Sequence, residues 1–598
     1  MNIQNILFPE IGKCTETELY FRTKDKAVYN SHKKALSFRE GDTVSFDTYF
    51  NGFSIDKWKK YTILNNLSLE LRVLGKFKIT LLCKEKIHED IFDTIVSETY
   101  IDAEEIKTVV LAYPIADVRG MLVFSLEALE DGSEFYGGSY VSDISRECMK
   151  IVKIGIAICT FKRESFVEKN LNILQNAILE NHDSPLYGHL EVFIADNGQT
   201  LDIERLSSEN IHINPNRNLG GAGGFTRDLI EIMRNNDKLQ ITHALLMDDD
   251  IVIEPEALAK TYLILSLLKE EYRDTFIGGA MLRLDQQYMQ VESGAVWNGG
   301  YLDSLKHGLD LRTCDACLYN EIEEYAEFNA WWYCCFPMSI VTKDNLPLPI
   351  FIRGDDLEYG LRNMKNLILL NGICVWHEAF ENKYSSFLEY YIIRNQLIDN
   401  SFHCQWYGKK QLMKTLLHHS LQEIMYYRYK NVELYHQGVK DFLKGPVWLM
   451  EQDGEALHKK IMSEGYRGQE LSALPMAFSY PMYERSRFVC DKKIGKIKRF
   501  ITFNGLFLPT RGENIVPMSA ARSPQFYRMK RVMHYDVTSR KAFITEKSIR
   551  KSLKYIFKTF GLMFVIVFKL QKAQRQYRTE GLRLRTLDFW CEYLGLKQ

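Results

Sequence analysis

Residues 244–251 join an apolar run of strand length to three consecutive carboxylates, those of Asp248, Asp249 and Asp250. Pro255 follows, and proline suits the first turn of a helix because its missing N–H is not needed there. The order strand, acidic turn, helix is therefore predicted. Side chains alternate along an extended segment, so Asp248 and Asp250 should project to one face and Asp249 to the other. Two oxygen ligands aimed at one point suit Mg²⁺ or Mn²⁺; a solvated acidic turn that caps the helix is the alternative.

The composition is that of a globular protein, since 46% of the 598 residues are hydrophobic and 26% are charged. The 76 basic and 77 acidic residues nearly cancel, so no overall field attracts nucleic acid and no such partner is expected. The 12 cysteines are scattered, and the N-terminus lacks the basic and apolar regions of a signal peptide. A cytoplasmic protein with reduced thiols is expected. The longest candidate membrane stretch, residues 560–568, has about half of the ~20 apolar residues that a spanning helix needs.

Alternation with a period of two runs from residue 46 to residue 140. Leu67, Leu69 and Leu71 alternate with polar neighbours, and the alternation resumes at Phe77 beyond a turn predicted at residues 74–76. A β-sandwich is predicted for residues 1–150. Sandwiches of this kind bind sugars or serve as structural modules, and the sequence leaves both roles open.

The pattern changes at Ile151, which begins a nearly continuous apolar run typical of a strand buried on both faces of a parallel sheet. Helical spacing follows over residues 165–179, and a second buried strand, residues 190–195, ends at Asp196. Ligands of open α/β sheets bind at the carboxyl ends of such strands. An α/β domain is therefore predicted for residues 151–400, with its ligand site at that edge.

Four glycines lie within residues 220–224, before a helical segment. Glycine lets backbone amides approach a phosphate or a ribose closely, and a simple turn is the alternative. The G-x-G-x-x-G spacing of dinucleotide-binding sites is absent, which disfavours a dinucleotide-dependent oxidoreductase.

Further candidate site residues lie between residues 327 and 380. Trp331 and Trp332 could form an aromatic wall for a sugar or belong to the core. Asp355 and Asp356 stand at the start of a helical pattern, where the helix dipole helps to keep a carboxylate ionised. Such a carboxylate is a candidate general base, and a helix cap is the alternative. His377 ends a short apolar strand.

In this order, the segments resemble family 2 glycosyltransferases of the GT-A fold, in particular the galactofuranosyltransferases of mycobacterial galactan synthesis. The motifs that carry the resemblance are Thr160-x-x-Arg163, Asp196-Asn197-Gly198, Asn218-Leu219-Gly220-Gly221-Ala222-Gly223-Gly224, Asp248-Asp249-Asp250, Trp331-Trp332, Gly354-Asp355-Asp356 and Trp376-His377. The resemblance covers nearly the whole chain. It implies an α/β fold in which a GT-A catalytic domain is joined to an N-terminal β-sandwich and a helical C-terminal region.

The resemblance also implies roles for particular residues around a UDP-sugar and a divalent cation, Mn²⁺ or Mg²⁺. Cation ligands would be Asp248, Asp250 and His377; nucleotide contacts Arg163, Asp196, Asn218 and Asp249; sugar contacts Glu292, Trp331 and Trp332; and the general base Asp356, with Asp355 beside it. One position departs from the pattern, because Gly354 stands where the galactan enzymes have an aromatic residue. That difference concerns acceptor recognition and not the chemistry.

The activity implied is the transfer of galactofuranose from UDP-galactofuranose, with inversion, to a hydroxyl of a growing lipid-linked surface polysaccharide. Two alternatives stay open: the same fold with another UDP-sugar, and a non-catalytic sugar-binding assembly module. The joint presence of Asp248, Asp250, Asp356 and His377 argues against the module, because a non-catalytic protein has no chemical need for all four.

Residues 401–598 show helical spacing, and residues 547–578 contain nine Lys or Arg and no Asp or Glu, interleaved with Phe557, Phe560 and Phe564. A basic amphipathic segment suits an anionic membrane surface, where each basic residue adds ~1 kcal/mol. Peripheral attachment at the inner face of the plasma membrane is predicted, and a solvated helix with a buried apolar face is the alternative. The oligomeric state is left open, a homo-oligomer included.

Overall fold

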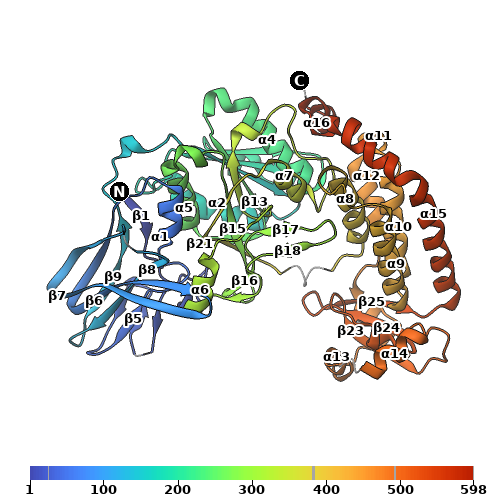
Figure 1. Cartoon of the computed structure of the whole chain (residues 1–598), viewed down its shortest axis with the longest axis horizontal. Helices are drawn as coiled ribbons and strands as arrows, with labels where there is room; N and C mark the ends of the chain where they lie inside the picture. The colour runs from blue at the N-terminus through green and yellow to red at the C-terminus, as the bar shows by residue number, and fades with distance from the viewer. Residues whose placement is uncertain (25, 117, 380–383, 490–492, 597–598) are drawn as a thin grey trace. The chain divides into compact units, whose positions relative to one another are not determined.

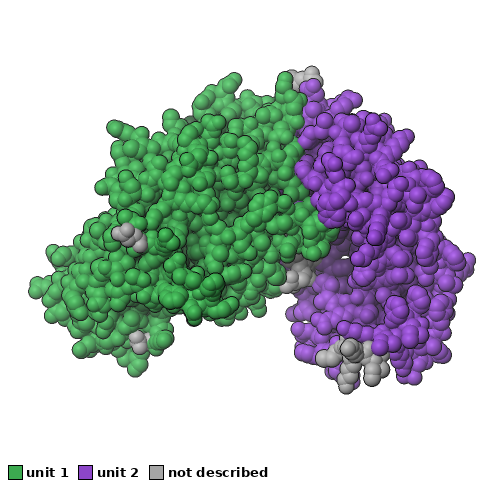
Figure 2. Space-filling view, viewed as in Figure 1, with its two compact units in different colours: residues 1–217, 224–345, 359–378 green, residues 218–223, 346–358, 379–598 purple. Residues whose placement is uncertain are grey.

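The computed structural model describes the chain except residues 25, 117, 380–383, 490–492 and 597–598. The chain has a mixed α/β fold (Figure 1) and divides into two compact units (Figure 2). The first unit contains residues 1–217, 224–345 and 359–378, and the second contains residues 218–223, 346–358 and 379–598.

Nine strands near the N-terminus form one hydrogen-bonded sheet in the first unit. They are β1 (Asn2–Asn5), β2 (Arg22–Thr23), β3 (Val28–Asn30), β4 (Ala35–Ser37), β5 (Thr43–Ser45), β6 (Leu67–Ile87), β7 (Asp90–Tyr113), β8 (Met121–Ala128) and β9 (Glu134–Val141), with helix α1 (Ile55–Tyr61) between β5 and β6. The strand order is β2-β5-β8-β6-β9-β4-β3, while β1 pairs with β9 and β7 pairs with β6.

The predicted turn at residues 74–76 is wrong, because β6 runs through it as one strand of 21 residues. Gly75 has a φ of +94° and lies where the pairing register shifts, so it forms a bulge within the strand. Before the bulge β6 pairs with β9, and beyond it β6 pairs with β8. Phe124 of β8 and Phe135 of β9 both contact Phe46, with ring centroids 4.3 and 5.3 Å apart. The strands therefore belong to one curled hydrogen-bonded sheet, and two separate sheets of a sandwich are not confirmed.

A ten-stranded sheet forms the centre of the first unit. Its strands are β10 (Ile154–Thr160), β11 (Leu190–Asp196), β12 (Ile211–Pro215), β13 (His243–Asp248), β14 (Ile251–Ile253), β15 (Phe276–Arg283), β16 (Met289–Glu292), β19 (Leu309–Asp310), β20 (Cys334–Pro337) and β21 (Leu367–His377). The order is β12-β11-β10-β13-β20-β15-β16-β19, while β21 pairs with both β14 and β15. A separate ribbon joins β17 (Ala295–Trp297) to β18 (Leu302–Ser304).

Helices accompany this sheet. They are α2 (Glu164–Leu174), which continues as a π-helix over Gln175–Leu179, α3 (Ile203–Leu206), α4 (Gly220–Leu239), α5 (Pro255–Leu267), α6 (Cys314–Glu321) and α7 (Asp355–Asn363). Of these, α2, α4, α5 and α7 lie where the sequence predicts helical segments. Strands β10 to β13 are parallel, with Thr160 opposite Asp196 and Cys159 opposite Asp248. The carboxyl ends of these strands thus meet at one edge of the sheet, which positions the site.

The second unit is not purely helical, and in this respect the prediction of a helical C-terminal region is incomplete. Its helices are α8 (Leu388–His403), α9 (Lys409–Met425), α10 (Tyr429–Phe442), α11 (Pro446–Met450), α12 (Gly454–Glu464), α13 (Tyr480–Arg487), α14 (Lys493–Ile501), α15 (Ile549–Thr579) and α16 (Leu587–Leu594). A four-stranded sheet in the order β22-β25-β24-β23 joins Gln469–Glu470, Lys541–Glu546, Met529–Tyr535 and Gly512–Pro517. Three consecutive buried residues in β24, Val532 to His534, hide the period of two that would have predicted it.

Among the described helices, none has the length and apolar character needed to cross a bilayer.

Helix α5 is buried along nearly its whole length, and its N-cap, Glu254, is 6% exposed. The Glu254 carboxylate accepts a hydrogen bond from the N–H of Glu256 at 3.4 Å and lies 3.8 Å from the Lys13 ammonium. Burial raises the pKa of Glu254 to about 7, and the nearby Lys13 acts against this rise. The folded protein therefore retains a proton on Glu254 that the unfolded chain releases at lower pH.

This proton makes stability depend on pH. As the pH rises from about 4.5 to about 7, the wild type should lose on the order of 3 kcal/mol of unfolding free energy relative to Glu254→Gln, which keeps a capping oxygen but does not titrate. Calorimetric unfolding at both ends of this range measures the difference. Glu180→Gln, at an exposed position of the same unit, is the control. An unchanged difference between wild type and Glu254→Gln across the range would contradict the assignment.

Candidate active site

Three side chains from distant parts of the sequence meet at the carboxyl edge of the central sheet. Asp248 ends β13, Asp250 precedes β14, and His377 ends β21. Strands β14 and β21 are antiparallel with Ile251 opposite His377, which sets the imidazole beside Asp250. One ligand atom from each of the three side chains lies within 4.8 Å of the other two. The structure thus brings together the residues expected to hold a cation.

The donor set of this triad fits Mn²⁺ or Mg²⁺. His377 Nε2 lies 3.1 Å from Asp250 Oδ1 and 3.9 Å from Asp248 Oδ2. Asp248 retains 36% of its side-chain exposure, while Asp250 and His377 are largely buried. Carboxylate oxygens suit hard divalent cations such as Mg²⁺ and Mn²⁺, and the imidazole nitrogen of His377 supplies a third ligand atom. The exposed side of Asp248 leaves room for further ligands.

Asp249 and Arg163 contact each other beside the triad, and Arg163 is the residue that precedes α2. The Arg163 guanidinium lies 2.9 Å from Asp249 Oδ1 and 2.6 Å from Asp250 Oδ2. Asp249 also accepts a hydrogen bond from the Thr160 hydroxyl at 2.7 Å, and its carbonyl accepts one from Asn170 at 3.1 Å. Burial raises the pKa of Asp249, and Arg163 and Thr160 oppose this rise. Burial alone would lower the pKa of Arg163, but Asp249 and Asp250 raise it. A fixed positive charge therefore stands next to the triad.

Asp196 and Asn218 bond to nearby backbone. The carboxylate of Asp196 is 2% exposed and accepts hydrogen bonds from the N–H groups of Gly198, Thr200 and Leu201 at 2.7–2.9 Å. It shapes the loop that follows β11. Asn218, in the second unit, accepts a hydrogen bond from the Gly220 N–H at 3.3 Å.

The glycine-rich segment forms the first turn of α4 and does not precede it. At Gly224 an added Cβ would lie 2.2 Å from Cys159 Sγ of β10. At Gly220, where φ is +73°, it would lie 2.0 Å from the carbonyl oxygen of Phe351. Close packing of protein on protein therefore accounts for these two glycines.

The three residues expected to contact sugar are buried in the first unit. Trp331 and Trp332 are 4% and 5% exposed. The Trp331 ring makes edge contacts with Phe225 and Tyr359, and Trp332 Nε1 donates to the Gly279 carbonyl at 2.9 Å. Glu292 accepts a hydrogen bond from the Ser304 hydroxyl. Core packing thus explains both tryptophans.

Asp355 and Asp356 begin α7, and their side chains belong to the second unit. The loop before them is strained, because Phe351 and Arg353 have φ values of +75° and +69°. The Asn395 side chain of α8 holds this loop by donating to the carbonyls of Ile350, Ile352 and Arg353 at 3.1, 2.8 and 2.7 Å. A side chain that binds three carbonyls of a strained loop fixes the direction of the carboxylates that follow.

Asp356 is half-buried, and Asp399 of α8 lies near it as a carboxyl that sequence reasoning missed. Burial raises the pKa of Asp356, while the Leu357 N–H and Arg353 oppose the rise. Burial raises the pKa of Asp399 well above its ordinary value, and Glu358, Asp355 and Asp356 add to this effect. An added Cβ at Gly354 would lie 2.6 Å from Asp399 Oδ2, so Asp399 explains why glycine stands there. The sequence carries no signal for Asp399, because only the structure shows that the polar residues of α8 are buried.

Known proteins are similar to this chain in sequence. Residues 3–136 match the family model described as Galactofuranosyltransferase 2 N-terminal. Galactofuranosyltransferase GlfT2 of Mycobacterium tuberculosis is 25% identical over 486 residues, covering 74% of this chain and 72% of that protein. The chain is a glycosyltransferase similar to GlfT2.

Two further proteins resemble this glycosyltransferase. GlfT2 of Mycolicibacterium smegmatis is 24% identical over 495 residues, covering 74% of this chain and 71% of that protein. The mannosyltransferase PcManGT from Pyrobaculum calidifontis, solved in complex with GDP-Man and Mn²⁺, is 12% identical, with a TM-score of 0.26 over 43% of this chain and 65% of that one.

Proposed function

We propose that this glycosyltransferase moves galactofuranose from UDP-galactofuranose to a hydroxyl of a growing cell-surface polysaccharide, with inversion at the anomeric carbon. The observation that carries the proposal is the meeting of Asp248, Asp250 and His377 in a chain that aligns with two galactofuranosyltransferases. The alignment supports galactofuranose as the donor sugar, and the geometry of the site supports cation-assisted transfer.

Asp248, Asp250 and His377 would hold Mn²⁺ or Mg²⁺, which when bound stabilises the negative charge of the departing UDP. Arg163 contributes its own positive charge, since its carboxylate neighbours keep it protonated. Asp249 fixes the position of that guanidinium, and the loop shaped by Asp196 and the segment at Asn218 are proposed to contact the nucleotide.

Asp356 is the proposed general base. Its raised pKa makes the carboxylate a better proton acceptor than an ordinary aspartate, while it remains ionised above that pKa. It would take the proton of the acceptor hydroxyl as that oxygen attacks the anomeric carbon and UDP leaves from the opposite side. Asn395 positions the loop before it, and Asp355 stands beside it.

Helix α15 supports a membrane-surface role for the second unit. One face, which includes Thr559, Leu562, Ile566 and Leu570, is buried. The opposite face carries a stripe of exposed rings at helical spacing, formed by Phe557, Phe560, Phe564 and Phe568, which are 54–71% exposed. Lysines and arginines flank the stripe. We propose that this face inserts into the headgroup region of an anionic membrane that presents a lipid-linked acceptor.

The donor and the cation are tested by one assay. Hydrolysis of UDP-sugars with Mn²⁺ should be fastest for UDP-galactofuranose when compared with UDP-galactopyranose and UDP-glucose. EDTA or Asp248→Asn should reduce it by about 10²-fold or more, since a ligand to the cation is lost. Asp237→Asn, at an exposed position of the same unit, should behave as the wild type. Full activity in EDTA would reject the cation, and a faster pyranose donor would reject galactofuranose.

The base is tested by Asp356→Asn. Turnover should fall by about 10²- to 10⁴-fold while UDP-sugar affinity, measured by titration calorimetry, stays unchanged. Asp588→Asn makes the same chemical change at an exposed first-turn position of another helix and serves as the control. Wild-type turnover in Asp356→Asn would exclude this carboxylate as the base.

The membrane face is tested by co-sedimentation with anionic vesicles at low salt. Replacing Phe560, Phe564 and Phe568 by serine should weaken partition by about tenfold or more, because each ring loses its burial in the interface. Trp406→Ser with Tyr480→Ser removes two exposed rings elsewhere on the second unit and should leave partition unchanged. Equal partition of all three proteins would count against insertion of this face.

A further inference from the structure

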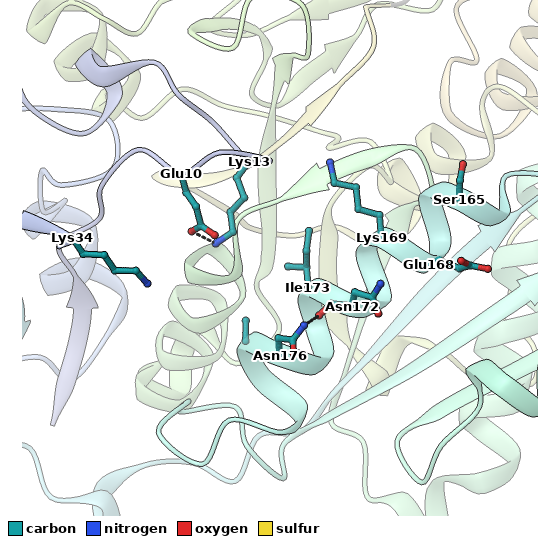
Figure 3. Close-up of a pocket in the computed structure, with 10 residues that line it drawn as sticks. Glu10, Lys13, Lys34, Ser165, Glu168, Lys169, Asn172, Ile173 and Asn176 are labelled. Atoms are coloured by element: carbon teal, nitrogen blue, oxygen red, sulfur yellow. Dashed lines mark hydrogen bonds and ion pairs between the residues drawn. The ribbon is translucent and has the colours of Figure 1, made fainter. Parts of the chain in front are cut away.

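A groove of about 780 Å³ lies in the first unit between α2 and the N-terminal segment (Figure 3). Ser165, Lys169, Asn172 and Asn176 line one side, and Lys13 and Lys34 line the other. The volume falls in the ~300–1,000 Å³ range of small-molecule sites. The cation triad is not part of its lining.

Helix α2 and the π-helix that continues it line this groove with polar residues, beside Ile173 and Ala177. Ser165, Lys169, Asn172 and Asn176 follow each other at intervals of four, three and four residues, which places them on one side of a helix. Val167, Leu171 and Leu174 are buried on the opposite side. The groove wall thus offers hydroxyl, amide and ammonium groups along nearly three turns. The groove wall continues past α2 into the π-helix. Such helices are rare in proteins, and those that occur often lie at functional sites.

The charges that line the groove are unbalanced. Lys34 and Lys169 are exposed, and their ammonium groups make no ion pair or hydrogen bond with any residue that the structure describes. Lys13 is paired with Glu10 at 2.8 Å, as Figure 3 shows, and the Glu168 carboxylate is engaged by Arg205. Two uncommitted ammonium groups, one on each side, therefore set the charge of the groove.

We propose that this groove binds a sugar that carries a phosphate group. Ammonium groups suit a phosphate, and Asn172, Asn176 and Ser165 can donate to and accept from sugar hydroxyls. No aromatic ring lines the groove among the described residues, so recognition relies on hydrogen bonds and charge. Such a ligand could be a free sugar phosphate or a phosphate-bearing glycan chain, which share this chemistry.

The test uses the full chain at low salt without donor or divalent cation, so it does not depend on the proposed transfer. Titration calorimetry with glucose 1-phosphate, inorganic phosphate and glucose gives three affinities. Lys34→Glu with Lys169→Glu should weaken glucose 1-phosphate binding by about tenfold or more. The matched control, Lys238→Glu with Lys343→Glu, reverses two exposed charges of the same unit and should leave it unchanged. Asn172→Ala with Asn176→Ala should abolish the preference for glucose 1-phosphate over inorganic phosphate.

Absence of binding to the wild type, or equal binding by the Lys34/Lys169 variant and its control, would overturn the proposal.

A second titration distinguishes a free sugar phosphate from a phosphate-bearing glycan chain. Tighter binding of an oligosaccharide with one internal phosphodiester than of glucose 1-phosphate, lost in the Lys34/Lys169 variant, supports a glycan chain. Equal affinity of the two probes, lost in the same variant, supports the free sugar phosphate.

Discussion

The pairing of β14 with β21 is the interaction on which the candidate site depends. It sets His377 opposite Ile251 and therefore beside Asp250, although the two residues are 127 positions apart. Carboxylates this close repel one another, and burial adds to the difficulty. Arg163 relieves both effects by contacting Asp249 and Asp250 together. A short strand and one guanidinium thus hold together a group of charges that would otherwise separate.

The sequence predicts β10, β11 and β13 of the central sheet because they are nearly continuous apolar runs that end in polar residues. All seven residues of β11 are buried, and Asp196 ends the strand as expected. The meeting of Asp248 and Asp250 with His377 needs more than spacing, since strand pairing decides it; the resemblance to a known family supplied that step. Within the Asp-rich segment, Asp249 differs from its neighbours as the alternation argument predicts, because Asp249 bonds to Thr160 while Asp248 and Asp250 lie beside His377.

Other features could not be predicted, for reasons that are physical. Gly75 is a residue type typical of turns, but it forms a bulge within β6. Only the strand pairing on either side of it distinguishes a bulge from a turn. The glycines of α4 suggested a phosphate, yet Cys159 and Phe351 occupy the space that they leave. Asp399 is an ordinary helical residue in the sequence, and only tertiary packing within the second unit buries it near Asp355, Asp356 and Glu358, which raises its pKa.

The length of strand β6 has a consequence for how the N-terminal sheet unfolds. Its two halves support different neighbours, β9 before Gly75 and β8 after it, and β7 follows it along both. Neither neighbour can detach without loosening the strand that carries the other. We therefore expect the two parts of the sheet to unfold together, because both depend on the one strand that joins them.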